Sequence, residues 1–178
     1  MRIIAGVLGG RIFDSPGGHR THPMSEKIRG AIFNSLGDIE GLRVLDPFAG
    51  SGALSFEAIS RGAAMAVVLD SNKLAYETIR KNIQSLGLED KIKASLIYAG
   101  SWHTRHKNDT FDLVLLDPPY DDLEPETAEK LALHTKKGGV AVFSLPPHGR
   151  IVLSEKQFSL LSSKNYGDAT LAFYRRTD

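Results

Sequence analysis

The chain has no cysteine, no long apolar run and almost no net charge, and each lack narrows what the protein can be. Without cysteine there is no disulfide framework, no thiolate chemistry and no cysteine-built zinc site. The longest apolar run, residues 63–69, is far shorter than the roughly 20 residues that a membrane span needs. Residues 1–6 lack the apolar stretch of a secretion signal. We therefore expect a cytoplasmic protein without a membrane partner.

Length and composition predict one globular domain. The chain has 178 residues, of which 42% are hydrophobic, enough for one full core and too few for two domains. Residues 1–37 read as a small extension, and residues 38–178 as the core of the domain. We expect a single domain over residues 1–178.

Charge is distributed unevenly along the chain. The net charge is only +1, but residues 1–36 hold five basic and two acidic residues. A short basic segment on a slightly acidic domain could steer the protein toward phosphates. An ordinary solvated surface with a few extra arginines explains the same charges, so charge alone leaves both interpretations open.

Apolar runs and helical patterns alternate along the sequence. Strands are predicted at residues 43–46, 66–70, 92–98, 111–116 and 140–143, with a closing pair at 158–162 and 170–174, and helices at 53–61, 72–86 and 124–135. Ahead of them, residues 2–5 and 11–13 flank a Gly9-Gly10 turn as a β-hairpin, and a helix begins after Ser25 and stops at Gly37. This order predicts an α/β fold: a mostly parallel sheet with an antiparallel C-terminal edge strand, helices on both faces, and an N-terminal hairpin-plus-helix extension.

A glycine-bearing loop follows the first core strand. It reads D-P-F-A-G-S-G from Asp46 to Gly52, and Asp70 ends the next strand. Glycines let the backbone approach a ligand closely, and a carboxylate 20 residues after Gly50 could accept two ribose hydroxyls. A dinucleotide would need its third glycine at Ser55, and Asp46 would repel a pyrophosphate. The acid better suits a cationic ligand such as S-adenosylmethionine, although a turn without any ligand remains open.

The tetrapeptide Asp117-Pro118-Pro119-Tyr120 follows the apolar strand 111–116. It is similar to the active-site motif of enzymes that methylate amino groups on nucleobases. Such an amine is a poor nucleophile until it is pyramidalised, and a carboxylate with a fixed proline carbonyl supplies two acceptors for its N–H bonds. A tyrosine gives a face on which a base stacks, worth about 1–3 kcal/mol. Because Asp and Pro also form ordinary turns, the four letters alone leave both interpretations open.

Together these motifs resemble a class I S-adenosylmethionine-dependent methyltransferase, and more narrowly the RsmD family of bacterial 16S rRNA guanine-N2 methyltransferases. The resemblance covers essentially the full chain. It rests on residues 2–6, 10–11, 21–23, 29, 31–34, 45–54, 117–120, 166–168 and 173–176.

The resemblance implies a monomeric, metal-free enzyme. It would methylate the N2 amine of a guanine in 16S ribosomal RNA or the small ribosomal subunit, leaving S-adenosylhomocysteine. The implied roles fall on three sets of residues: Asp117, Pro118, Pro119 and Tyr120 for catalysis; Asp46, Phe48, Gly50, Gly52, Asp70, Ser71 and Ser101 for the cofactor; Arg2, Arg11 and Arg20 for RNA.

Three other functions stay open. An N6-adenine or N4-cytosine methyltransferase acting on DNA or RNA could use the same D-P-P-Y motif. A non-catalytic RNA-binding assembly factor could retain the fold, and a nicotinamide oxidoreductase fits least. Elsewhere, Trp102 is expected in the core, and His103 and His106 on the surface without a metal.

Overall fold

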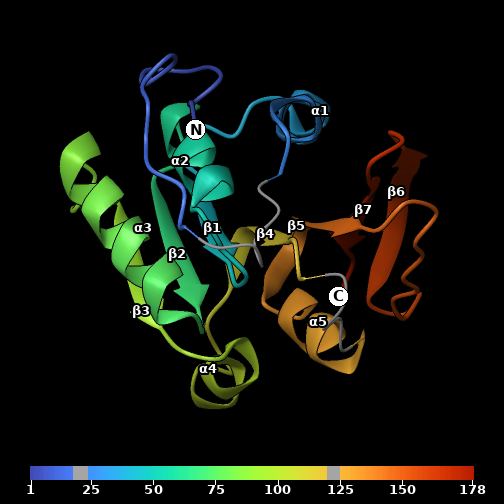
Figure 1. The fold of residues 1–178 in the computed structure, drawn as a ribbon. Helices are drawn as coiled ribbons and strands as arrows, with labels where there is room; N and C mark the ends of the chain where they lie inside the picture. The colour runs from blue at the N-terminus through green and yellow to red at the C-terminus, as the bar shows by residue number, and fades with distance from the viewer. Residues whose placement is uncertain (18–23, 120–124) are drawn as a thin grey trace.

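Seven strands form one sheet in the order β3-β2-β1-β4-β5-β7-β6 (Figure 1). The computed structural model describes residues 1–17, 24–119 and 125–178. The strands are β1 (Arg43–Asp46), β2 (Met65–Asp70), β3 (Ile92–Leu96), β4 (Phe111–Leu116), β5 (Thr135–Leu145), β6 (Phe158–Asn165) and β7 (Thr170–Arg176). Strands β1 to β5 pair in parallel, and β7 is antiparallel to both β5 and β6. The α/β sheet predicted from the sequence is confirmed.

Among the described residues, five helices accompany these strands: one precedes β1, and four connect the successive strands from β1 to β5. They are α1 (Glu26–Leu36), α2 (Ala53–Ser60), α3 (Lys73–Leu86), α4 (Ala99–Arg105) and α5 (Pro125–Ala132). Ser25 caps α1 by accepting the N–H of Ile28 at 3.3 Å, and Asn72 caps α3 by accepting the N–H of Ala75 at 3.1 Å. Both starts agree with the sequence. Within the described ranges, no helix is long and apolar enough to cross a membrane.

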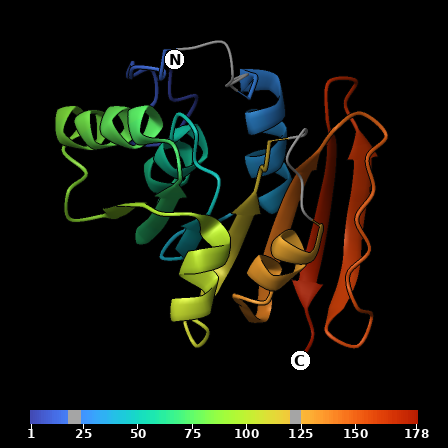
Figure 2. The ribbon, with the colours of Figure 1, turned by 60° about the horizontal axis from the view of Figure 1, so that its bottom comes forward.

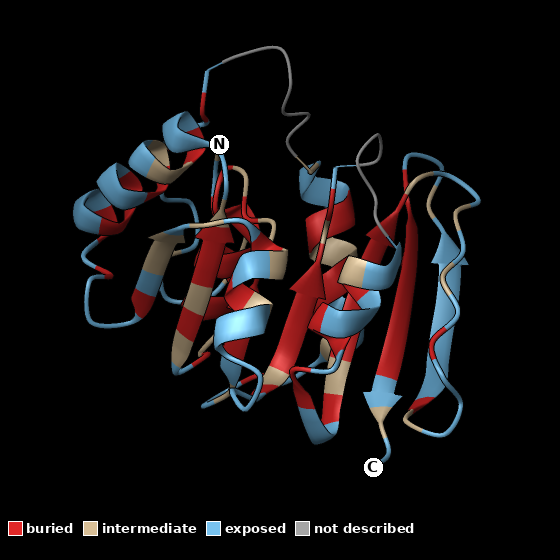
Figure 3. Cartoon of the chain, turned by 90° about the horizontal axis from the view of Figure 1, so that it is seen from below, coloured by how far each residue is buried: buried red, intermediate tan, exposed pale blue. Residues whose placement is uncertain are grey.

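The sheet separates two hydrophobic clusters. Helices α1, α2 and α3 cover one face, and α4 and α5 cover the other (Figure 2). Strand β4 contributes side chains to both clusters. Leu113 and Leu115 belong to the first cluster, and Val114 and Leu116 belong to the second. The central strands are buried along most of their length (Figure 3), as is the whole of α2, whereas the other helices expose their outer sides.

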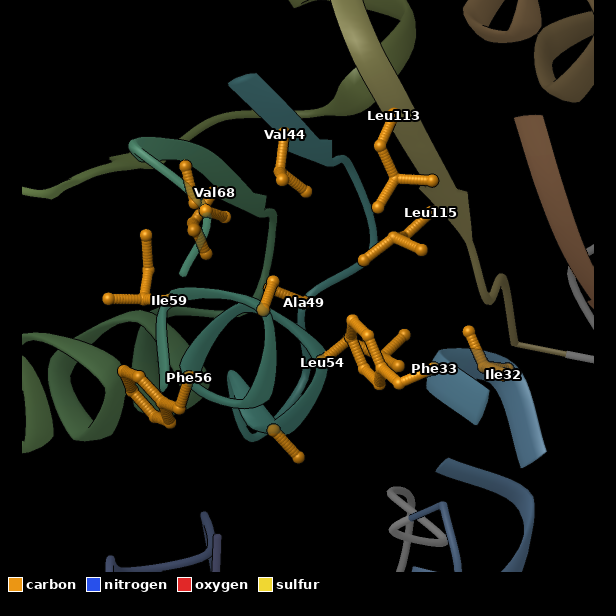
Figure 4. Close-up of a cluster of buried hydrophobic side chains, with 14 of the residues drawn as sticks. Ile32, Phe33, Val44, Ala49, Leu54, Phe56, Ile59, Val68, Leu113 and Leu115 are labelled. Atoms are coloured by element: carbon orange, nitrogen blue, oxygen red, sulfur yellow. The ribbon is translucent and has the colours of Figure 1, made fainter. Parts of the chain in front are cut away.

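The first cluster includes residues from the predicted N-terminal extension. Ile32 and Phe33 of α1 point toward Leu54 of α2 and Leu115 of β4 (Figure 4). Ile32 and Phe33 are each 1% exposed. The hydrophobic core therefore continues from the described parts of residues 1–37 into the sheet.

Several predicted boundaries are wrong. The strand predicted at 158–162 continues to Asn165 as β6, and the strand predicted at 170–174 continues to Arg176 as β7. The strand predicted at 92–98 ends at Leu96, and residues 99–105 form α4, a helix that the sequence did not predict. The helix predicted to run to residue 135 ends at Ala132. Strand β5 already begins at Thr135 opposite Phe111, and the pairing resumes only at Val140, so the Gly138-Gly139 segment lies in an irregularity inside the strand.

The predicted hairpin pairs as expected but is too short to form regular strands. Arg2 and Ile12 make an antiparallel bridge. Around it, the Ile3 N–H donates to the Arg11 carbonyl at 2.9 Å, and the Gly10 N–H donates to the Ile3 carbonyl at 2.8 Å. These bonds define the N-terminal hairpin, residues 1–13.

Helix α2 holds the N-terminal hairpin through two polar residues. Both oxygens of the Glu57 carboxylate accept backbone N–H groups, from Ile4 at 2.8 Å and from Ala5 at 3.1 Å. Gly6 has φ +85°, and a Cβ there would lie 1.8 Å from the Ser60 carbonyl oxygen. Only glycine allows this approach, so the hairpin rests directly on the end of α2.

A buried ion pair joins the N-terminal hairpin, α1 and α2. The side chains of Arg29 and Glu57 are both 0% exposed, and the Arg29 Nε lies 3.5 Å from the Glu57 carboxylate. Arg29 also donates from Nη2 to the Arg2 carbonyl at 2.6 Å, and Arg61 donates to Glu57 at 2.8 Å. Burial lowers the pKa of Arg29, while Glu57 opposes that shift.

The end of the N-terminal hairpin leads onto α2 and α3. The Phe13 ring packs edge-on against Phe56 of α2, with centroids 5.1 Å apart. Asp14 donates its N–H to the Asn82 side-chain oxygen at 3.0 Å, and Asn82 returns a bond to the Asp14 carbonyl at 2.8 Å. Two helices therefore fix the path of residues 13–14.

Candidate active site

Three aspartates meet at one edge of the sheet. Asp46 ends β1 and Asp70 ends β2, while Asp117 directly follows β4, the neighbour of β1 on its other side. The strand order reverses between β1 and β4, which is the point where ligands bind in sheets of this kind. The structure therefore brings together the acids that the sequence placed at three separate strand ends.

Asp46 is fully buried and incompletely paired. Its Oδ2 accepts the Ser55 hydroxyl at 2.7 Å, while Oδ1 is buried without a hydrogen-bond partner among the described residues. Burial raises the pKa of Asp46 to about 7; the Ser55 hydrogen bond opposes the shift, and the nearby Asp117 and Asp70 charges add to it. A buried carboxylate with an unused oxygen fits a cationic ligand and disfavours an anionic one.

Asp70 organises the loop between β1 and α2. One carboxylate oxygen accepts the Gly50 N–H at 2.7 Å, and the other accepts the Asn72 N–H at 2.7 Å. Burial raises the pKa of Asp70, and these two bonds oppose the shift. Each oxygen keeps a second acceptor site for a ligand hydroxyl. Gly52 caps α2 with φ +78°, and a Cβ there would come within 2.8 Å of the Phe56 ring.

Asp117 directly follows β4 and lies next to Ser144 of β5. The Ser144 hydroxyl of β5 donates to the Asp117 carboxylate, and burial raises the pKa of Asp117 to about 6 against this bond. Pro118 is buried and Pro119 is exposed. A narrow gap beside the carboxylate is lined by Ile32, Leu54, Leu115, Leu116, Asp117, Val142 and Ser144. Helix α1 of the N-terminal segment thus contributes a wall next to Asp117.

Other predicted site residues lie at or beyond the margin of this cluster. Phe48 is half-buried, and Ser71 and Ser101 are exposed. In the part of the chain that the structure describes, neither serine hydroxyl bonds to the three aspartates. Tyr120, the last residue of the D-P-P-Y motif, lies outside the described residues.

The structure describes two of the three predicted RNA-binding arginines. Arg2 is exposed and pairs with Glu26 at 2.8 Å, and Arg11 is exposed on the N-terminal hairpin. Arg20 lies outside the described residues.

Two site residues were not identified from the sequence as partners of the acids. Ser55 was noted only because it is not glycine, yet its hydroxyl bonds Asp46. Ser144 is the one hydroxyl residue in the apolar end of its strand, and this unusual position was the only sequence signal that could have pointed to it. Both lie too far along the chain from their aspartates for spacing to pair them.

Trp102 is 5% exposed, so the predicted core position is confirmed. Its ring stacks on His106, which is exposed as expected, with centroids 4.7 Å apart. His103 was expected on the surface but is half-buried, because its ring bonds the buried His134. Among the described residues, no group of three or more His, Cys, Asp or Glu side chains is arranged to hold a metal ion.

Replacing Asp46 by asparagine is expected to stabilise the free protein at pH 8 more than at pH 5. The folded protein holds a proton on Asp46 up to about pH 7, whereas the unfolded chain releases it near the ordinary value of 3.8. Stability therefore falls as pH rises through this window, and a neutral asparagine removes that loss. We expect the gain in unfolding free energy to be about 2–3 kcal/mol larger at pH 8 than at pH 5, measured by urea unfolding.

The exposed Asp90, in the turn before β3, provides the matched control. Asp90→Asn should leave the unfolding free energy nearly unchanged at both pH values, because its carboxyl stays in water. An equal gain at pH 5 and pH 8 for Asp46→Asn would mean that Asp46 does not titrate in the folded protein.

Comparison with known proteins agrees with this geometry. The family model described as Conserved hypothetical protein 95 matches residues 1–175. The YlbH protein of Bacillus subtilis is 36% identical over 128 residues, which span 68% of each chain. Ribosomal RNA small subunit methyltransferase D of Haemophilus influenzae is 29% identical over 181 residues, spanning 98% of this chain and 93% of that one.

Solved structures extend the likeness to the fold. The yhhF protein of Escherichia coli superposes with a TM-score of 0.87 at 28% identity, covering 99% of this chain and 98% of that one. The family match, the close relatives and the seven-stranded sheet lead to one assignment: this chain belongs to the RsmD family, whose model is described as Conserved hypothetical protein 95.

Proposed function

We propose that this protein transfers the methyl group of S-adenosylmethionine to the N2 amine of a guanine in small-subunit ribosomal RNA. One observation carries the proposal: the Asp117 carboxylate, bonded by Ser144, lies beside the buried Asp46 at the ligand-binding edge of the sheet. The relative in Haemophilus influenzae is named for methylation of small-subunit ribosomal RNA, and the family supports guanine N2.

The cofactor fits the acidic end of the site. Asp46, with its unpartnered Oδ1, would face positive charge, and Asp70 has acceptor capacity left for ribose hydroxyls. Gly50 and Gly52 would let the backbone approach, with Phe48, Ser71 and Ser101 at the margin. S-adenosylmethionine, when bound, supplies an electrophilic methyl group and leaves as S-adenosylhomocysteine. A solved neighbour of 15% identity and TM-score 0.66, a protein named SMU.776, is described as complexed with S-adenosylhomocysteine.

Asp117 and Pro118 would activate the amine. The carboxylate accepts one N–H of the guanine amine, and the Pro118 carbonyl accepts the other, so the nitrogen lone pair is withdrawn from the ring. The Ser144 hydroxyl keeps Asp117 oriented and opposes the rise in its pKa that burial causes. Pro119 limits the backbone after Pro118, and Tyr120 would stack on the base. Methylation would form an N–C bond, break the S–C bond of the cofactor and release one amine proton to solvent, so the chemistry requires positioning and charge and no strong base.

The substrate surface would begin at the N-terminal hairpin. Arg2, Arg11 and Arg20 would meet RNA phosphates, and the guanine would be splayed out of the RNA to reach Asp117. We further propose that residues 1–178 form a single domain, residues 1–37 meeting RNA and residues 38–178 holding the cofactor. The protein would act as a cytoplasmic monomer without a metal.

Methyl transfer from labelled S-adenosylmethionine tests the proposal directly. Purified protein is incubated with small ribosomal subunits, naked 16S rRNA and duplex DNA, and the labelled nucleoside is identified by mass spectrometry. We expect N2-methylguanosine from an RNA substrate. N6-methyladenine or N4-methylcytosine would replace the guanine assignment, and no transfer to any substrate would favour a non-catalytic assembly factor. Heat-denatured protein serves as the control.

A further inference from the structure

A cationic groove lies between α4 and α5, on the face of the sheet away from the N-terminal hairpin. The two helices run side by side on that face (Figure 2). The groove has a volume of about 260 Å³ and is lined by Gly100, His103, Thr104, Lys107, Thr127 and Lys130. A water molecule occupies about 30 Å³ in the liquid, so the groove can hold a group several times larger.

The lining is basic, and none of the described residues that form it is a carboxylate. Burial lowers the pKa of His103, and the positive charges of Lys107, which lies beyond the end of α4, and of Lys130 on α5 lower it further. Lys130 pairs with Glu126 at 2.7 Å, which occupies one of its three ammonium protons. The groove therefore suits an anion and neither a metal cation nor an apolar ligand.

The histidines beside the groove form a directed chain of hydrogen bonds. The Nδ1 of His134 lies 2.6 Å from the Asp109 carbonyl, so this nitrogen must donate. The Nε2 of His134 is then the acceptor, and the Nδ1 of His103 donates to it at 2.9 Å. Because His134 is 1% exposed, the chain fixes one wall of the groove against the start of β5. A fixed wall lowers the ordering cost of binding.

We infer that this groove binds a backbone phosphate of the RNA substrate. The inference rests on the proposed function, which supplies the RNA. Lys107 and Lys130 are the donors, because the Thr104 hydroxyl already donates to the Gly100 carbonyl at 3.0 Å. Arg11 lies with the N-terminal hairpin on one face of the sheet and the groove lies on the other. The groove runs along α4, from Gly100 near the carboxyl end of β3 to Lys107 near the start of β4, so RNA bound at Asp117 could continue along this face to the two lysines.

A paired substitution tests the groove. The variant Lys107→Ala/Lys130→Ala is compared with Lys91→Ala/Lys156→Ala, which removes two exposed lysines outside the groove. The KM for small subunits is measured over about 50–200 mM salt, the range in which phosphate contacts weaken most visibly. The groove variant should raise KM about tenfold at low salt and reduce the salt slope by about 1–2, one for each lost phosphate contact. The control should stay within about twofold of the unmodified protein.

Two further readouts separate the causes. The kcat at saturating subunits, the affinity for S-adenosylmethionine and the melting temperature should not change, since the lysines lie outside the site and are exposed. If the groove variant has an unchanged KM and salt slope while the unmodified protein methylates subunits, the phosphate-binding role of the groove is rejected and the proposed function stands. Weaker S-adenosylmethionine binding would also overturn it, by assigning the groove to the cofactor. No methylation by the unmodified protein would reject the proposed function, and the inference with it.

Discussion

Asp117→Asn is expected to reduce kcat by about 10²–10³-fold, the range seen when one preorganised polar group is removed from an active site. Asparagine keeps one acceptor but places an N–H₂ where the carboxylate would face the amine or the Ser144 hydroxyl. Single-turnover methyl transfer to small subunits measures the effect. Affinity for S-adenosylmethionine should stay within about threefold, because the cofactor would lie mainly against Asp46 and Asp70.

Ser144→Ala tests the same carboxylate by a second route, because it leaves Asp117 in place and removes only its hydrogen-bond donor. It removes the hydrogen bond that lowers the pKa of Asp117, so the pKa should rise further above about 6. Since the ionised carboxylate is the acceptor, activity falls as pH drops through that pKa, and the variant should lose activity at a higher pH. At pH 8.5 its kcat should approach that of the unmodified protein. A kcat unchanged by Asp117→Asn would remove Asp117 from the mechanism, and loss of cofactor binding would reassign it.

Glu57→Gln is expected to destabilise the protein by about 3–5 kcal/mol, because it leaves the buried Arg29 without its charge partner. The side chain of Arg29 is 0% exposed, and its Nε and Nη1 make no hydrogen bond among the described residues, so Glu57 supplies the main compensation. Glutamine also offers one acceptor oxygen to Ile4 and Ala5 in place of two. Urea unfolding measures the total effect, and amide exchange at residues 4 and 5 measures the local one.

The double variant Arg29→Met/Glu57→Gln separates charge from shape. Removing both charges should recover part of the loss, because no unpaired ion is then left in the core. Arg61→Gln, which removes a partly exposed partner of Glu57, should cost less than about 1 kcal/mol. A double variant no more stable than Glu57→Gln would show that the backbone contacts, and not the buried charge, carry the effect.

Local sequence patterns predicted most of the fold. The boundaries of β1 and β4 were correct because their apolar residues are bracketed by turns or acids. Helix α4 was missed because residues 99–105 are only seven and include Gly100 and Trp102, which weaken a helical pattern. The early start of β5 was missed because Gly138-Gly139 normally signals a turn, and only pairing with β4 reveals a strand on both sides.

The sequence predicted the three aspartates of the candidate site, because each stands at the end of a predicted strand. Asp46, Asp70 and Asp117 converge because parallel strands align their carboxyl ends. The pairing of Ser144 with Asp117, and of Glu57 with the N-terminal hairpin, depends on side chains that are distant in sequence. No periodicity encodes such contacts, so they became visible only in the folded chain.

The attachment of the N-terminal hairpin also affects how the chain is made. Its partners lie 52 to 53 residues downstream at Glu57 and 68 residues downstream for the contact between Asp14 and Asn82. Synthesis proceeds at about 5–20 residues per second, so the first segment waits about 3–14 seconds before Asn82 is added. During that interval the apolar Ile3 and Phe13 have no core to enter. The part of the protein proposed to meet ribosomal RNA is therefore made before the helices that hold it, and it reaches its final position only after they are made.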